Sequence, residues 1–342
     1  MKLHRFLALC LALLLFSACA APPEEESPCR AEVLAMDTVM TLTVYGQSAE
    51  RGAEILQKAA ARIDELEGLL SVADENSEIY RANHSGGAAV PLSDDARQLL
   101  AGALDLCAST NGALDVTIYP VVRAWGFTTG DYQVPEAAAL EKLLPQVDYS
   151  GVALSGGTLT LPEGMELDLG AVAKGYAGDQ LMALFAAEGV TAAIVSLGGN
   201  VQTLGSRPDG SPWRVALQDP DGGYAAVLEV ADRAVITSGG YQRYFERDGE
   251  TYIHIIDPST GRPARTGLAS VTVVADSGVI GDGLSTALFV MGREKAEACW
   301  RERRDFDFVL LAEDGSVVIT EGLEDCFSLY GSWEGRNLEI VR

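Results

Sequence analysis

The most informative stretch for the fold is Asp168-Leu169-Gly170-Ala171-Val172-Ala173-Lys174-Gly175-Tyr176-Ala177. It contains the end of an apolar run, a turn residue and the start of a helix. Residues 167–169 are typical of a strand end, and residues 171–187 have the apolar spacing of a long helix. We therefore predict a strand that turns at Gly170 into a helix. The free N–H groups and the dipole of a helix start favour a phosphate, and Lys174 lies one turn inside. An ordinary amphipathic helix with a surface lysine explains the pattern equally well.

The rest of the chain predicts helices and strands in irregular order. Helices are expected over residues 49–70, 93–109, 135–144, 281–291 and 293–303. Strands are expected over residues 33–45, 152–154, 158–161, 192–197, 201–205, 213–217, 226–230, 234–237, 252–256, 268–274, 308–311 and 317–320. Because strands and helices do not alternate regularly, we predict an α+β fold with mixed or antiparallel sheets rather than a doubly wound parallel sheet. No internal repeat or second linker interrupts residues 31–342, so one two-lobed domain is expected there.

The first residues have the features of an export signal. A basic start precedes the apolar run 6–16, which is too short to span a bilayer as a helix. The run ends in a sequence that resembles the lipobox of bacterial lipoproteins, Leu15-Phe16-Ser17-Ala18-Cys19. We predict a lipoprotein signal peptide over residues 1–18 and lipidation of Cys19. A simple signal peptide cut at the neighbouring alanines is the alternative.

Residues 19–30 follow as an acidic, proline-rich segment without apolar periodicity, so we expect a short tether. Acyl chains on Cys19 would hold the protein at the cell membrane, on its extracytoplasmic face, without a spanning helix. No later apolar run reaches the ~18 residues that a second membrane span needs.

The charge and composition exclude several partners and enzyme classes. The formal net charge is −24 and no basic cluster stands out, so nucleic acid is not expected as a partner. An acidic protein that binds an anionic ligand needs a local cation, either a metal ion or a placed lysine. The widely spaced cysteines after the signal form no zinc motif. The sequence does not decide whether two of them form a disulfide. The chain has no Gly-x-Ser-x-Gly, Walker A or Gly-x-Gly-x-x-Gly pattern.

A second stretch, residues 281–288, has the spacing of a cation site. Asp282 and Thr286 are four residues apart, which places both oxygens on one face of a helix. A carboxylate and a hydroxyl suit a hard cation such as Mg²⁺, which keeps waters and shares phosphate oxygens. Alternatively, Asp282 only caps the helix and Thr286 packs.

A third stretch, residues 252–263, contains a lone histidine. Alternation puts His254 on one face of a strand, where it is a candidate general base near neutral pH. A strand histidine satisfied by hydrogen bonds is the alternative.

A fourth stretch, residues 112–120, combines small residues with an acid. Trp125 and Phe127 follow it closely. The combination suits a flat ring that needs stacking and a polar edge, although core packing explains the aromatic residues equally well.

In their order along the chain, these stretches resemble the ApbE-type flavin transferases. The similarity begins at Met36-Asp37-Thr38-Val39-Met40, ends at the Asp282–Thr286 segment and covers roughly residues 31–335. It includes two further stretches, Ser196-Leu197-Gly198-Gly199-Asn200 and Ser238-Gly239-Gly240-Tyr241-Gln242-Arg243-Tyr244-Phe245. The resemblance implies an ApbE-like (T-fold-like) domain over residues 31–342.

The resemblance also implies an enzyme that binds FAD and Mg²⁺. Such an enzyme moves FMN from FAD to a threonine, sometimes a serine, of an acceptor protein and releases AMP. The implied FAD contacts are Met36, Ala113, Leu114, Asp115, Asp168, Lys174, His254 and Ile255. The implied Mg²⁺ ligands are the Ala171 carbonyl, Asp282 and Thr286, and His254 would deprotonate the acceptor hydroxyl. Ala73 departs from the family pattern, because relatives often carry a tyrosine there that stacks on FAD.

The implied partner is an exported or membrane flavin-acceptor protein. A subunit of an Rnf or Na⁺-pumping NADH:quinone reductase complex, or a protein with an FMN-binding domain, is of this kind. Two alternatives stay open, namely Mg²⁺-dependent hydrolysis of FAD to FMN and AMP, and a non-catalytic FAD-binding lipoprotein. The Asp282–Thr286 pair argues against the second, because simple ring binding needs no metal.

Overall fold

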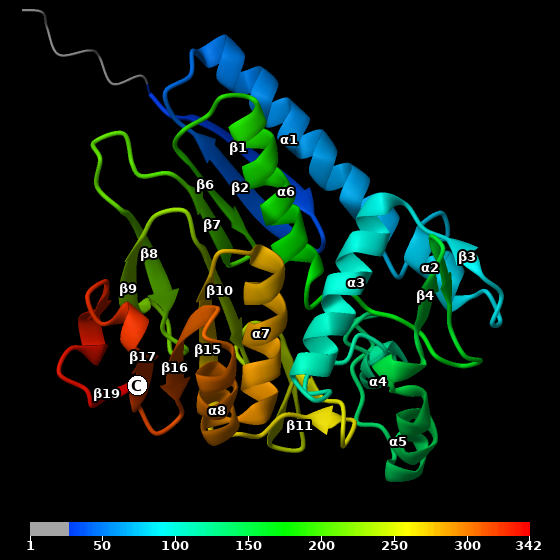
Figure 1. Ribbon diagram of the computed structural model, residues 1–342. Helices are drawn as coiled ribbons and strands as arrows, with labels where there is room; N and C mark the ends of the chain where they lie inside the picture. The colour runs from blue at the N-terminus through cyan, green and yellow to red at the C-terminus, as the bar shows by residue number, and fades with distance from the viewer. Residues whose placement is uncertain (1–26) are drawn as a thin grey trace, which may run out of the picture.

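A computed structural model describes residues 27–342 (Figure 1). The predicted signal peptide, Cys19 and most of the predicted tether lie outside the described residues. The described chain is α+β, as predicted, with mainly antiparallel sheets and with helices that gather on one side of the largest sheet.

A nine-stranded sheet forms the centre of the protein, in the order β1-β2-β6-β7-β10-β15-β16-β17-β19. Neighbouring strands pair antiparallel except β17 and β19, which are parallel. The strands are β1 (Cys29–Ala35), β2 (Thr38–Val44), β6 (Ala193–Leu197), β7 (Asn200–Leu204), β10 (Ala234–Gly239), β15 (Leu268–Ala275), β16 (Phe306–Ala312), β17 (Val317–Thr320) and β19 (Leu338–Val341).

Four helices pack on one face of this sheet, and a fifth packs on α1 and α7. The four are α1 (Ala49–Leu70), α6 (Ala173–Ala187), α7 (Gly278–Met291) and α8 (Arg293–Arg303), and the fifth is α3 (Asp94–Ser109). Ser48 and Ser93 cap α1 and α3, because each side chain accepts a hydrogen bond from the amide three residues ahead. None of the helices in residues 27–342 combines the length and the hydropathy that a membrane span requires.

The opposite face of the sheet is covered by a second, smaller sheet. It consists of β8 (Trp213–Gln218), β9 (Tyr224–Val230) and β18 (Phe327–Leu329). Alternate residues of β16 therefore enter different cores, with Phe308 and Leu310 under the helices and Val309 and Leu311 against the small sheet. Burial on both faces explains why this strand is an unbroken apolar run.

A third core lies beside the main sheet. It joins α4 (Tyr119–Trp125) and α5 (Ala137–Leu143) to the hairpin of β11 (Tyr244–Arg247) and β12 (Glu250–Ile253). Trp125 is buried there, and its Nε1 donates to the Gly261 carbonyl at 2.8 Å. The remaining short elements are α2 (Glu78–Asn83), β3 (Val90–Pro91), β4 (Ala153–Ser155), β5 (Thr158–Thr160), β13 (Ile256–Asp257), β14 (Arg262–Pro263) and single 3-10 turns at 144–146, 149–151, 321–323 and 331–333.

The single strand predicted over residues 33–45 is wrong, because β1 and β2 form a hairpin. Met36 and Asp37 make its two-residue turn, with φ angles of 48° and 58°. Positive φ at both turn residues matches the twist of the flanking strands. The Glu67 carboxylate of α1 holds the turn, since it accepts a hydrogen bond from the Met36 N–H at 2.8 Å.

Three helix limits also differ from the prediction. Helix α6 begins at Ala173, after a turn, and residues 167–169 are not a strand. Helix α7 begins at Gly278, earlier than predicted, because the Ser277 hydroxyl caps it. Pro135 lies before α5, whose N-cap is Glu136.

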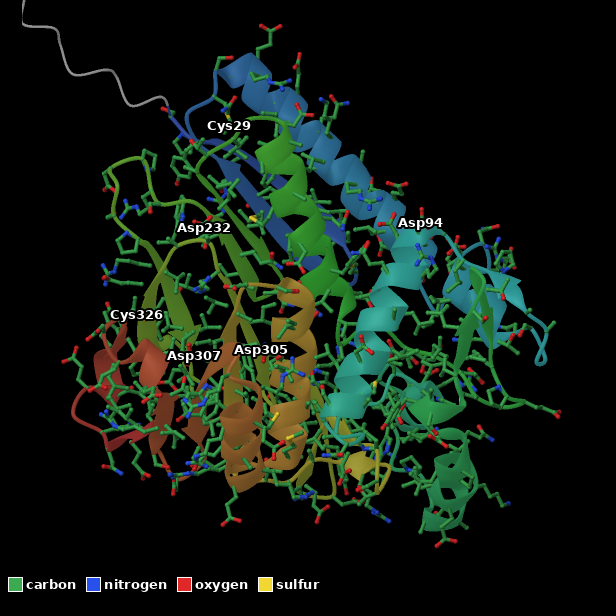
Figure 2. All side chains as sticks on the ribbon, viewed as in Figure 1. Cys29, Asp94, Asp232, Asp305, Asp307 and Cys326 are labelled. Carbon is green, nitrogen blue, oxygen red and sulfur yellow. The ribbon has the colours of Figure 1, made fainter. Side chains whose placement is uncertain are left out.

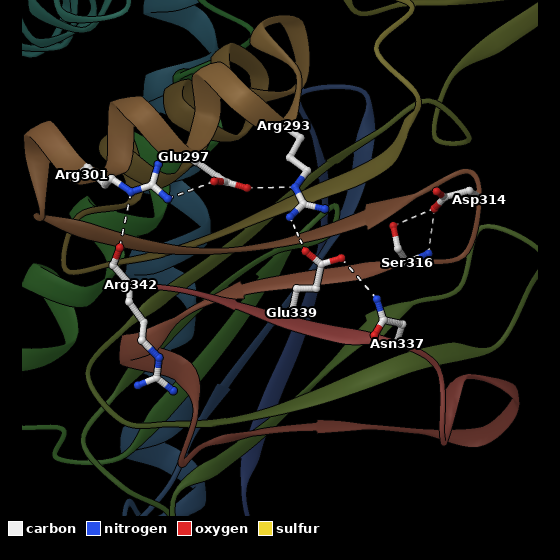
Figure 3. A network of polar contacts seen from close by, with 8 residues as sticks. All are labelled: Arg293, Glu297, Arg301, Asp314, Ser316, Asn337, Glu339 and Arg342. Atoms are coloured by element: carbon white, nitrogen blue, oxygen red, sulfur yellow. Dashed lines mark hydrogen bonds and ion pairs between the residues drawn. The ribbon is translucent and has the colours of Figure 1, made fainter.

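Residues 317–320 were the last predicted strand, but a further strand, β19, pairs parallel with β17 at the edge of the sheet. Figure 3 shows the polar contacts that connect this strand to α8. Arg293 forms ion pairs with Glu297 on its own helix and with Glu339 on β19. The guanidinium lowers the pKa of the Glu339 carboxyl.

The four cysteines of residues 27–342 are all unpaired. Figure 2 places Cys29 at the start of β1 and Cys326 near β9, on different parts of the molecule. Cys107 is buried, and burial raises the pKa of its thiol to about 12. Such a thiol is unreactive at neutral pH.

Candidate active site

A cavity of about 820 Å³ lies where the β1–β2 turn, α6, α7 and the bend after β12 meet. Its size is typical of a site for a small organic ligand. All predicted site residues within the described part line it: Met36, Ala113, Leu114, Asp115, Asp168, Ala171, Lys174, His254, Ile255, Asp282 and Thr286. Cys19, the predicted lipidation site, lies outside the described residues.

Helices α6 and α7 approach each other closely at two glycines. A Cβ atom built at Gly175 would overlap the Gly278 carbonyl, and one at Gly278 would overlap the Gly175 carbonyl and the Gln202 side chain. Because both side chains are absent, the Gly175 N–H reaches Asp282 and donates to Oδ2 at 2.9 Å. The two glycines therefore bring Asp282 next to the first turn of α6.

Asp282 lies on the second turn of α7 and is 4% exposed. The alternative in which Asp282 caps the helix is wrong, because Ser277 is the cap. Thr286 follows one turn later, with Oγ1 at 3.2 Å from Ser238 Oγ. Burial raises the pKa of the Asp282 carboxyl, and the nearby Lys174 ammonium opposes that shift.

The donor set around Asp282 fits a hard cation. A carboxylate, a hydroxyl and a carbonyl oxygen, here from Asp282, Thr286 and Ala171, are ligands that Mg²⁺ prefers, with its other positions left to water and phosphate. The buried Asn200 Nδ2 has no hydrogen-bond partner in the described residues, although its amide lies near enough to lower the pKa of Asp282. Residues 27–342 contain no group of three His, Cys, Asp or Glu arranged to bind a metal. A cation here would therefore need phosphate oxygens or water to complete its shell.

The turn before α6 offers fewer free amides than the sequence suggests. The Gly170 N–H donates to Asp168 Oδ1 at 2.8 Å. The amides three and four residues after Leu169 both donate to its carbonyl. Lys174, whose Nζ lies 3.5 Å from the Gly170 carbonyl, is the positive charge that this turn presents to the cavity.

His254 lies at a bend between β12 and β13 rather than on the face of a strand. Its main-chain N–H donates to the Arg243 carbonyl at 3.1 Å, and its ring Nδ1 lies 3.0 Å from the same oxygen. Because a carbonyl only accepts, Nδ1 carries the proton and Nε2 of the neutral ring has the free lone pair. Desolvation lowers the pKa of His254 to about 4, and the charges of Arg243 and Lys174 act in the same direction. The ring is therefore neutral at pH 7 and able to accept a proton.

Asp115 organises its own stretch of chain. Its Oδ1 accepts from the Thr117 N–H at 2.8 Å and from the Thr117 hydroxyl at 2.6 Å, and Oδ2 accepts from the Tyr149 N–H at 3.1 Å. Its side chain therefore fixes the shape of the wall. Phe127 also lines the cavity, whereas Trp125 packs in the third core.

Arg243 and Asn200 line the cavity but are not among the predicted site residues. Lys174 and Arg243 are the two basic side chains that line the cavity. Five acidic side chains also line it, namely Asp37, Glu67, Asp115, Asp168 and Asp282. Both residues lie in stretches that carry the family resemblance. A lone arginine or asparagine has no spacing rule that points to a ligand, so the residues alone did not identify them.

The comparisons with known proteins agree with this architecture. Residues 36–310 match the ApbE family, and the chain belongs to that family. A similar protein is the FAD:protein FMN transferase of Salmonella typhimurium, which is 34% identical in an alignment of 332 residues that covers 92% of this chain and 94% of the relative. The FAD:protein FMN transferase of Treponema pallidum is 34% identical over 319 residues, 86% of this chain and 87% of the relative.

Solved structures share the fold. The ApbE protein of Thermotoga maritima matches with a TM-score of 0.83 at 28% identity, over 88% of this chain and 99% of that chain. The apo form of the flavinyl transferase ApbE of Pseudomonas stutzeri matches with a TM-score of 0.80 at 30% identity, over 90% of this chain and 98% of that chain. The predicted ApbE-like α+β fold is confirmed.

Proposed function

We propose that this chain transfers FMN from FAD to a threonine, or a serine, of an acceptor protein and releases AMP in a Mg²⁺-dependent reaction. One observation carries the proposal. A single cavity combines the side-chain oxygens of Asp282 and Thr286 with two basic side chains, Lys174 and Arg243, and with the neutral ring of His254. The names of the curated relatives support the same enzyme class.

The charges of the cavity suit a pyrophosphate. FAD is anionic, and its phosphates need neutralisation in a cavity with several carboxylates. Lys174 from α6 and Arg243 from the segment before β11 supply two positive groups. Asp282, Thr286 and the Ala171 carbonyl would hold Mg²⁺, which would neutralise charge on the phosphoryl oxygens.

His254 is placed to activate the acceptor. A threonine hydroxyl is a weak nucleophile, and His254 Nε2 takes its proton as the hydroxyl oxygen bonds to the FMN-side phosphorus. The bond from that phosphorus to the bridging oxygen breaks, and this oxygen leaves with AMP. The Arg243 carbonyl accepts from Nδ1–H and fixes the ring orientation.

A second candidate is hydrolysis of FAD to FMN and AMP, with water in place of the acceptor. The half-buried position of His254 favours it, because the residue is not fully enclosed by protein. A non-catalytic FAD-binding lipoprotein is less well supported, since ring binding has no use for the buried Asp282 beside Thr286.

The test combines the protein without its signal peptide and lipid anchor with FAD, MgCl₂ and the purified flavin-acceptor domain of an Rnf-type subunit. Intact-mass spectrometry should find the acceptor heavier by one FMN, with AMP released in equal amount. AMP without an adduct would favour hydrolysis, and FAD recovered unchanged would favour binding alone.

We also propose that lipidated Cys19 holds the enzyme at the extracytoplasmic face of the cell membrane. The lipobox-like sequence that ends at Cys19 supports this location, and an exported or membrane flavoprotein is the acceptor that it would meet. Replacing Cys19 by Ala should move the protein from the membrane fraction to the soluble fraction. An unchanged distribution would contradict the anchor.

A further inference from the structure

The outer face of the β1–β2 hairpin carries an exposed apolar pair. Leu34 is 78% exposed and Val39 is 59% exposed, the two largest exposed fractions among the big apolar residues of 27–342. They are direct cross-strand partners, so their side chains lie side by side on one face.

The outer face of the hairpin is apolar near the turn and charged further from it. Arg30 and Glu32 lie on the same face further from the turn, and they form an ion pair at 3.6 Å. Charged residues are usual on an exposed edge strand such as β1. The apolar pair is therefore confined to the end of the hairpin that contains the turn.

The turn end of the hairpin is also the cavity wall. Met36, Asp37 and Thr38 line the cavity, and Leu34 and Val39 are the cross-strand pair that follows the Ala35–Thr38 pair next to the turn. Leu34 is two residues before Met36 in the chain.

The hairpin that carries the pair is packed against the rest of the protein. Strand β2 pairs with β6 from Met40 to Val44, and α1 covers the other face of the hairpin (Figure 1). Glu67 anchors the turn through the Met36 N–H. A rigid apolar surface loses little conformational entropy when a partner binds it.

We infer that Leu34 and Val39 form the docking surface for the acceptor protein, which contacts them with apolar side chains close to its reactive threonine or serine. The inference rests on the proposed function. A hydroxyl that attacks FAD must enter the cavity, while the chain on either side of it stays at the rim. In an extended acceptor segment, residues two positions from the hydroxyl lie about 7 Å from it, so their side chains would contact the rim of the cavity near Leu34 and Val39.

The experiment compares the wild type with Leu34→Ser/Val39→Thr and with Val39→Thr alone. Leu338→Ser is the matched control, since Leu338 is 38% exposed on β19, at the opposite edge of the sheet. FMN transfer is measured at increasing concentrations of the acceptor domain of an Rnf-type subunit, and FAD affinity is measured separately by fluorescence titration. We expect the double variant to lose about tenfold in kcat/KM for the acceptor, mainly through KM. Its FAD affinity should stay within about twofold, and the control should behave as the wild type.

Three results would overturn the inference. The first is an unchanged kcat/KM for the acceptor in the double variant. The second is a parallel loss of FAD affinity, which would mean that the pair shapes the ligand site. The third is a wild-type dimer that becomes monomeric in the variant with transfer unaffected, because a second copy would then occupy this face. Absence of transfer by the wild type would instead overturn the proposed function, and this inference with it.

Discussion

Replacing Gly175 by Ala tests how the α6–α7 contact positions the site. The new Cβ would overlap the Gly278 carbonyl and lie 2.8 Å from the Asp282 Cβ, so the helices must separate. Overpacking costs about 1–3 kcal/mol, and loss of the Gly175 N–H to Asp282 hydrogen bond costs about 1.5–3 kcal/mol. The better helix propensity of Ala returns about 1 kcal/mol. We therefore expect a loss of about 2–5 kcal/mol in the free energy of unfolding.

Thermal unfolding followed by circular dichroism measures this loss, and a fall in Tm of about 3–8 °C is expected for a domain of this size. Gly68→Ala is the control, because Gly68 lies within α1 and a Cβ there meets no atom within 4 Å. It should leave stability unchanged or raise it by up to about 1 kcal/mol. Gly175→Ala should also weaken the Mg²⁺ dependence of AMP release, since Asp282 loses the donor that orients it. A Gly175→Ala protein with wild-type Tm and wild-type Mg²⁺ dependence would refute the reasoning.

Asp282→Asn should lower Mg²⁺-dependent AMP release by about 100-fold or more while preserving the fold, as measured by Mg²⁺ titration of the initial rate. Wild-type turnover in this variant would show that the cation is held elsewhere. His254→Gln should lower kcat about 100-fold with little change in FAD affinity, and equal losses in both would remove its role as base. Because the pKa of His254 is lowered to about 4, its ring stays neutral at pH 7, and kcat/KM of the wild type should fall only as the pH drops toward 4. Arg243→Ala should weaken FAD binding about tenfold and raise the pKa of His254, since a positive charge that disfavours the imidazolium is removed. A histidine NMR titration that matches the wild type would contradict that coupling.

The long helices followed from their apolar spacing and their caps. Helices α1, α3 and α8 begin and end within a residue of the prediction, because Ser48, Ser93 and Gly292 mark their starts. The β1–β2 turn was missed, because Met36 and Asp37 continue the strand-like pattern and lack the Asn-Gly or Gly-Gly signal of a two-residue turn.

The predicted start of α7 was three residues too late, for a different reason. Gly278 and Gly281 have poor helix propensity, but Gly278 must be small because it packs against Gly175 of α6, and Gly281 because it packs against Ile236 of β10. The sequence predicted residues that all line one cavity, and their roles in binding and catalysis stay predictions. It did not identify Arg243, which acts through its position beside His254 and Asp168 rather than through any local spacing.

In the proposed mechanism, the phosphates of FAD lie between Lys174 and a cation held by Asp282 and Thr286. A crystal soaked with FAD and Mn²⁺ tests it directly, because anomalous scattering locates the metal. We expect one Mn²⁺ at about 2.0–2.3 Å from oxygens of Asp282 and Thr286, in contact with a phosphate that Lys174 also reaches. Mn²⁺ at another site, or FAD bound with its phosphates away from Lys174, would contradict it.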